Sequence, residues 1–238
     1  VMSWHPQKNE LVLITEKRDI WWLYQMDVNN KKKTKAKLAT EYQRIYEVDY
    51  IDDKTLHLNA STDALSDLYA YLPVTRESRR LTADFYDDLN ASYGTVLGQK
   101  GILFKSNRHR DTIFTNPLDS ILPVQPFNLY LLPLGDDLTV SKNLWRFTAN
   151  KDYDIDRPSI SGTDQITFLS DESGVKQAKT LKISADQNNT LIHSSHGDHD
   201  FLTYHAASGK GIGVMQKGKR IYLIKDNPDK IDTTAKER

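Results

Sequence analysis

The chain has 238 residues and a mass of 27.3 kDa, which is enough for one large domain or two small ones. Its 32 basic and 32 acidic residues leave no formal net charge, so no overall field draws the chain to nucleic acid or to an anionic membrane. Cysteine is absent, which excludes a disulfide framework, a thiolate zinc site and a cysteine nucleophile.

Membrane insertion is not expected. The mean hydropathy is −0.60, and no apolar run approaches the roughly 18 residues of a spanning helix. The first residues also lack the basic and apolar regions of an export signal. We therefore expect any such signal to lie outside this sequence.

Short alternating or apolar segments, each the length of one strand, recur along the chain. They occupy residues 10–15, 55–60, 101–106, 165–170 and 211–216. Their starts are 45, 46, 64 and 46 residues apart. A second series of strands follows at a nearly constant offset and contains Tyr24, Tyr69, Tyr130, Leu181 and Tyr222. A third series ends at Thr40, Thr82, Thr148 and Ser194, and a further strand follows each acidic loop.

Four short strands in a period of about 45 residues predict the blade of a β-propeller. A β-sandwich and a solenoid remain as alternatives, whereas no window sustains helical periodicity. We expect an all-β propeller over residues 1–225, with antiparallel four-stranded units at about 1–45, 46–88, 89–154, 155–200 and 201–225. Residues 226–238 are expected to be a polar tail or linker. The units could form a five-bladed ring or part of a larger one.

The long interval in the third unit comes from an insertion at about residues 111–126. Insertions between strands lie at the rim of a propeller, where they cost little loop entropy. This one carries more apolar residues than a solvated loop normally does: Ile113, Phe114, Leu118, Ile121, Leu122 and Val124. The segment either folds back over the propeller surface or binds a partner protein.

The repeats resemble those of TolB-like propellers, which belong to the WD type. The fourth unit carries the resemblance best, through Asp156, Pro158, Gly162, Phe168, Ser170, Asp171, Gly174 and Leu181. The second unit lacks the Ser-Asp-x-x-Gly turn, and the fifth is shortened. The long third unit is similar to those of large envelope proteins of the Bacteroidetes. The resemblance implies a non-enzymatic periplasmic or secreted scaffold that binds envelope proteins or neighbouring domains. Similar repeats also form the propellers of prolyl oligopeptidase-like and tricorn-like peptidases.

The sequence contains only a weak candidate for a metal site and none for a cofactor site. His193, His196 and His199 offer imidazole ligands, but they occupy a loop that is acidic in the other units, so we predict no metal and no cofactor. Asp88, Asp154, Asp156 and Asp200 occupy equivalent loops and are predicted to accept hydrogen bonds from loop amides.

Other motifs are interpreted as structural. The lysines between Lys31 and Lys37 follow Asn29 and Asn30, as expected of a solvated hairpin tip. Residues 208–213 are a predicted β-turn, and Trp4, Trp21, Trp22 and Trp145 are expected in or beside strands. No G-x-S-x-G motif is present. The sequence therefore predicts a binding scaffold rather than an enzyme, with an accessory propeller for a peptidase and a carbohydrate-binding propeller as alternatives.

Overall fold

The computed structural model describes residues 1–38, 42–62, 64–113, 125–186, 188–194, 201–207, 210–217 and 220–226, with backbone only for His193 and from 201 onward. These residues form strands β1 to β19 and no helix, so this part of the chain holds no helical segment able to cross a bilayer. Every strand pairs antiparallel with its neighbours.

The strands form separate sheets in chain order. The first sheet contains β1 (Met2–Trp4), β2 (Glu10–Glu16), β3 (Trp21–Asp27) and β4 (Lys33–Lys37). The second contains β5 (Arg44–Tyr50), β6 (Leu56–Ser61), β7 (Ser66–Leu72) and β8 (Glu77–Arg80). The third contains β9 (Asp88–Val96), β10 (Gln99–Ser106), β11 (Asn128–Pro133) and β12 (Trp145–Arg146). The fourth contains β13 (Ile155–Ile160), β14 (Gln165–Ser170), β15 (Gln177–Lys182) and β16 (Thr190–Ser194). The fifth contains β17 (Phe201–Ala207), β18 (Lys210–Lys217) and β19 (Arg220–Asp226).

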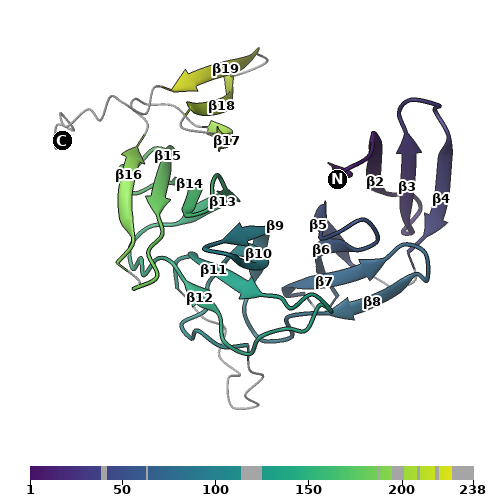
Figure 1. The fold of residues 1–238 in the computed structure, drawn as a ribbon, viewed down its shortest axis with the longest axis horizontal. Coiled ribbons are helices and arrows are strands. Elements are labelled where there is room, and N and C mark those ends of the chain that lie inside the picture. The colour runs from purple at the N-terminus through teal and green to yellow at the C-terminus, as the bar shows by residue number, and fades with distance from the viewer. Residues whose placement is uncertain are drawn as a thin grey trace.

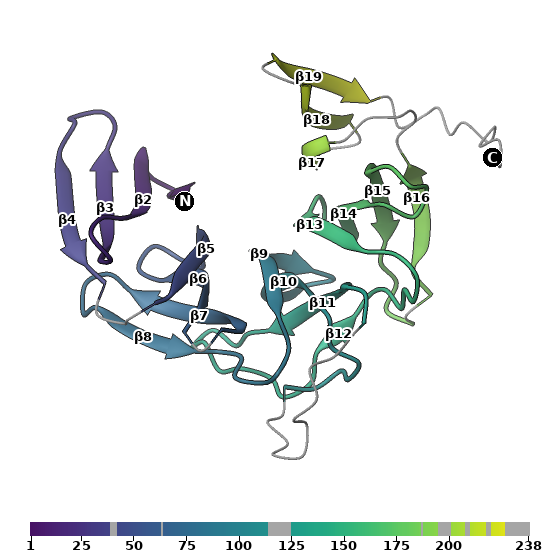
Figure 2. The same cartoon turned by 180° about the vertical axis from the view of Figure 1, so that it is seen from behind.

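The sheets follow one another in an arc, with β1, β5, β9 and β13 on its inner side (Figure 1). Each of these first strands contacts the first strand of the next sheet. The arc is open between the first and fifth sheets, and the view from behind shows the same opening (Figure 2). The arrangement confirms the predicted all-β propeller fold and excludes two face-to-face layers.

Strand alternation places the core between sheets. Leu56 and Leu58 of β6 pack with Val12 and Ile14 of the first sheet. At the equivalent positions of the third sheet, Ile102 and Phe104 belong to the core shared with the second sheet. In the fourth sheet, Ile166 and Phe168 belong to the core shared with the third. The second, third and fourth sheets thus each bury one apolar face against the sheet before it, as one blade alone could not.

Inner strands β5, β9, β13 and β17 each contain a register shift at the corresponding place. Such bulges change the direction of side chains. Hydrogen bonds link Glu47, Asn90 and Arg157, which occupy equivalent positions in β5, β9 and β13. The Asn90 side-chain amide donates to Glu47 Oε1 at 2.8 Å, and the Arg157 backbone N–H donates to Asn90 Oδ1 at 3.4 Å. Asn90 and Arg157 have φ values of 52° and 46°. The bulges therefore hydrogen-bond neighbouring sheets around the inner side of the arc.

The lysine run is a correction to the sequence interpretation. Lys33, Lys35 and Lys37 lie in β4, the outer strand of the first sheet, and not at a hairpin tip. The tip is formed by residues 28–32, where the Asp27 carboxylate accepts the N–H groups of Asn29 and Asn30. These lysines pair with β3 because they alternate with Thr34 and Ala36, a pattern that suits an edge strand. Lysines on an edge strand also discourage pairing with a further strand.

Candidate interaction surface

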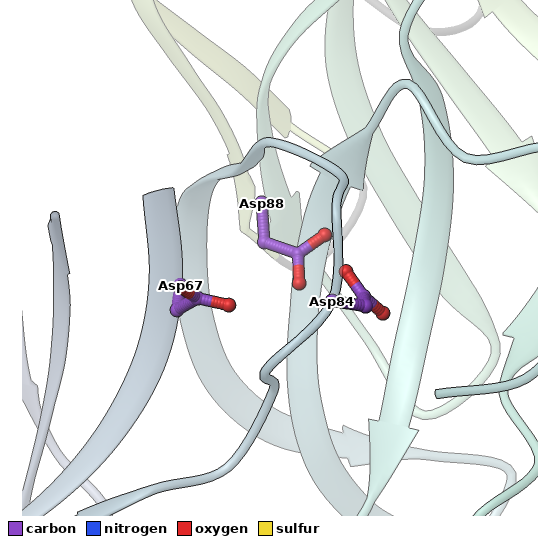
Figure 3. Close-up of side chains that lie close together, drawn as sticks. All are labelled: Asp67, Asp84 and Asp88. Carbon is purple, nitrogen blue, oxygen red and sulfur yellow. The ribbon is translucent and has the colours of Figure 1, made fainter. Parts of the chain in front are cut away.

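The most conspicuous polar cluster is buried and joins the second and third sheets. It contains Asp67 from β7, Asp84 from the loop after β8, and Asp88 at the start of β9 (Figure 3). Arg108, which is fully buried, donates from Nη2 to both oxygens of Asp88 at 2.6 and 2.7 Å, and from Nη1 to Asp84 at 3.1 Å. Arg80 Nε donates to Asp67 at 3.1 Å.

Aromatic side chains enclose the same guanidinium. Arg108 lies 5.3, 5.5 and 5.8 Å from the ring centroids of Tyr86, Phe104 and Tyr130. The Tyr130 hydroxyl also donates to the Arg108 carbonyl at 2.8 Å. Several charge-assisted hydrogen bonds and close aromatic rings together stabilise a buried guanidinium.

Burial shifts the pKa values of Asp67 and Asp84. It raises the pKa of Asp67 to about 7, against the opposing effect of Arg80. Burial, with the nearby Asp88 charge, raises the pKa of Asp84 to about 6. Because folding raises both pKa values above 3.8, the stability these carboxyls contribute is present at low pH and declines as the pH rises towards 7.

Three carboxylates within 4.8 Å could in principle hold a cation. Here Arg108 already occupies two of them and Arg80 the third. The residues therefore do not fit a metal site, and the cluster is a structural ion network between two sheets.

The predicted loop carboxylates have differing partners. Asp154 Oδ1 accepts the backbone N–H of Phe127 at 2.9 Å, a bond to a loop amide. Asp88 instead accepts from Arg108, and Asp156 accepts from Lys105 and Lys176 at 2.8 and 3.0 Å. The sequence did not signal these pairings because the cations lie 20 or more residues away.

Only the two ends of the insertion are described. Thr112 forms an isolated antiparallel bridge with Asn143, and the Ile113 N–H donates to the Lys142 carbonyl at 3.0 Å. Ile113 is partly buried against the core between the second and third sheets, so it is held by the propeller itself. Phe114, Leu118, Ile121, Leu122 and Val124, like His196, His199 and Asp200, lie outside the described residues. His193 lies in β16.

A groove of about 440 Å³ lies beside the start of the insertion, between the third and fourth sheets. Trp145 and Leu97, which line it, are 36% and 38% exposed, whereas Phe147 is buried. Asp111 and Arg146 form a 3.9 Å ion pair in the same wall. The remaining lining residues are Leu144, Ile183, Ser184, Ala185 and Asn189.

Two hydrogen bonds join the walls of the groove. The Leu97 N–H donates to the Thr163 carbonyl at 2.7 Å, which joins the β9–β10 turn to the fourth sheet. The Asn189 side chain donates to the Phe147 carbonyl at 3.1 Å. An apolar floor with a few fixed polar groups is typical of a binding groove.

Comparison with known proteins defines the fold. No family model and no curated protein matches the chain. A solved structure of TolB from Acinetobacter baumannii matches 96% of this chain and 52% of its own, with 15% identity and a TM-score of 0.66. A TolB structure from Agrobacterium tumefaciens matches 95% of this chain and 76% of its own, with 15% identity and a TM-score of 0.61.

The fold is that of a TolB-like propeller. The predicted resemblance is confirmed at this level, while the likeness to Bacteroidetes envelope proteins stays a prediction. The TolB-like fold is also similar to part of a peptidase: prolyl oligopeptidase B from Galerina marginata matches 96% of this chain and 32% of its own, with 7% identity and a TM-score of 0.63. The chain thus spans about half the length of the A. baumannii TolB structure and a third of the peptidase.

Proposed function

We propose that this TolB-like propeller is a non-catalytic scaffold of the cell envelope, periplasmic or secreted, that binds other proteins or neighbouring domains. The groove beside the insertion carries the proposal, because it exposes Trp145 and Leu97 on a rigid frame of sheets. Partly exposed aromatic residues beside polar groups are typical anchors of protein interfaces. From the sequence alone, we include the apolar residues of the insertion in this proposal as a further partner contact.

Two variants test the groove. Trp145→Ser removes the aromatic anchor, and replacement of residues 114–124 by a Gly-Ser linker removes the apolar insertion. Each should reduce capture of envelope proteins by the immobilised chain about tenfold, as expected when an interface anchor is lost. Val74→Ser is the matched control, since Val74 is 88% exposed in the β7–β8 turn. Equal capture by all variants would contradict the proposal.

A role as accessory propeller of a peptidase is the second candidate, and the similarity to solved structures of a prolyl endopeptidase and a prolyl oligopeptidase favours it. It predicts a serine-hydrolase segment encoded next to this chain, which reading the flanking coding sequence would check. The carbohydrate-binding alternative predicts several aromatics along one groove. Among the described lining residues, Trp145 is the one exposed aromatic.

A further inference from the structure

The buried cluster between the second and third sheets contains more carboxylates than cations. Asp67, Asp84 and Asp88 each bring an oxygen to within 4.8 Å of the other two (Figure 3). Two guanidiniums pair with them, those of Arg80 and Arg108. With all five side chains ionised, the interior would hold one uncompensated negative charge, which is energetically costly.

The surrounding groups do not balance this charge. Arg146 lies over the Tyr130 ring at 5.7 Å and pairs with Asp111 at 3.9 Å. The Tyr86 hydroxyl lies 3.0 Å from His109 Nδ1. The charged and titratable groups around the cluster, besides its own members, are Tyr86, Asp87, His109, Arg110, Asp111, Tyr130 and Arg146. Among the described residues, none of these forms an ion pair with the three carboxylates.

The hydrogen bonds show which carboxyls can carry a proton. Both oxygens of Asp88 accept from Arg108 Nη2, at 2.6 and 2.7 Å, and this pairing holds Asp88 ionised. Asp67 Oδ1 accepts one long bond, 3.3 Å from the Thr82 hydroxyl. Asp84 Oδ1 likewise accepts one bond of 3.3 Å, from the Tyr86 backbone N–H. Asp67 and Asp84 thus each have a weakly bonded oxygen on which a proton can reside.

A buried acceptor without a donor lies beside the cluster. The Asn59 side chain donates through Nδ2 to the main-chain carbonyls of Asp67 and Asp88, at 3.1 and 2.6 Å, and so joins the two sheets. Its Oδ1 atom is buried and has no hydrogen-bond partner among the described residues. A protonated carboxyl would bring an O–H donor into this interior, whereas three ionised carboxylates can only accept.

We propose that the cluster retains one proton at neutral pH, carried by Asp67 or by Asp84, and that release of this proton weakens the contact between the second and third sheets. The proton brings the net charge of the cluster to zero. After its loss, three carboxylates repel one another at the sheet boundary with two guanidiniums to offset them. The raised pKa values of Asp67 and Asp84 agree with this assignment. The proposal is independent of the scaffold function, because it concerns a joint within the fold.

Solution NMR of the full chain, labelled with carbon-13 at the aspartate carboxyls, tests the retained proton. An aspartate carboxyl signal should titrate between about pH 5 and 8, far above the ordinary value of 3.8. Asp67→Asn and Asp84→Asn should each abolish this titration, because either neutral amide leaves two carboxylates for two guanidiniums. Asp136→Asn, which alters an exposed carboxylate paired with Lys100, should leave it unchanged. Labelling aspartate alone excludes Glu47, whose pKa is also raised by burial.

Hydrogen–deuterium exchange tests the effect on the sheet contact. At pH 8, peptides covering β8 and β9 should exchange about fivefold faster in the unaltered chain than in Asp67→Asn, because the cluster has then lost its proton. At pH 5 the two chains should exchange alike. If Asp67→Asn does not fold, the titration of the unaltered chain still decides whether the proton is present.

Three results would overturn the proposal. The first is that no aspartate of the unaltered chain titrates above pH 5. The second is a titration that persists unchanged in both Asp67→Asn and Asp84→Asn. The third is equal exchange of β8 and β9 at pH 8 in the unaltered chain and in Asp67→Asn, since loss of the proton would then not weaken the sheet contact.

Discussion

Single buried residues show how unevenly polar groups are satisfied in this propeller. Arg108 and its carboxylates form a paired network, whereas His57 in β6 is fully buried and neither ring nitrogen has a hydrogen-bond partner among the described residues. Burial lowers the pKa of His57 to about 4, although the Asp49 charge opposes the shift. An unpaired buried polar group lowers stability, and removing one partner of a buried ion pair lowers it further because the remaining charge is left without compensation.

His57→Leu should therefore stabilise the protein, raising the free energy of unfolding by about 1–3 kcal/mol at pH 7. The folded pKa of about 4 lies below the ordinary 6.5, so the stability associated with neutral His57 is present above pH 6.5 and lost as the pH falls towards 4. The variant should lose that part of the acid sensitivity. Urea unfolding at pH 7 and pH 5 checks both effects, and destabilisation at both values would contradict them.

Arg108→Leu should destabilise the protein by about 3–5 kcal/mol, because Asp84 and Asp88 would be left buried without their cation. Adding Asp88→Asn should restore part of the loss by removing one unpaired charge. Lys100→Ala breaks the exposed pair with Asp136 and should leave thermal unfolding unchanged. If Arg108→Leu lowered stability no more than Lys100→Ala does, the buried ion network would not contribute to the stability of the fold.

At the scale of elements, the backbone conformation of turns and bulges determines the direction of the adjoining strands. The β9–β10 turn contains Leu97 at φ 49° followed by Gly98 at φ 80°. Two successive residues with positive φ are the pattern of a type I′ hairpin turn, which favours Asn-Gly. Leucine at the first position is strained, and its side chain is 38% exposed.

Leu97→Asn should accordingly raise the free energy of unfolding by about 0.5–1 kcal/mol, because asparagine tolerates the left-handed backbone better. Gly98→Ala is the contrasting change and should destabilise the turn, although open space surrounds the new methyl group. Thermal unfolding of both variants provides the measurement. Equal stabilities would mean that the turn relaxes at no cost.

At the scale of the whole molecule, burial differs systematically between middle and outer strands. Strands β6, β10 and β11 are buried on both faces, while β4 has exposed lysines along its length. Backbone amides in middle strands should therefore open only with larger cooperative units.

Hydrogen–deuterium exchange should be slowest in β6, β10 and β11 and markedly faster in β4. Mass spectrometry of peptides from each strand would measure the difference. If β4 of the isolated chain were protected as strongly as β6, β10 and β11, its assignment as an exposed edge strand would be wrong.

Much of the fold could be predicted from the sequence because the same pattern of short alternating strands occurs several times along the chain. One short alternating strand is ambiguous. Equivalent strands about 45 residues apart, with Tyr24 and Tyr69 at matching positions, leave few architectures that could bury all of them. The tryptophans were correctly expected in or beside strands. The lysine run was misplaced because Asn29 and Asn30 signalled a turn whose length the sequence does not fix.

The sequence by itself determined the blade pattern, since alternation and spacing are properties of neighbouring residues along the chain. Only the tertiary structure decided that Asp88 pairs with Arg108 and that a groove opens beside Trp145. These features depend on distances between segments far apart in the sequence and on which sheet covers which face. The alternation of apolar residues along a strand indicates which face of its sheet is suited to burial. The packing between sheets determines which residues cover that face.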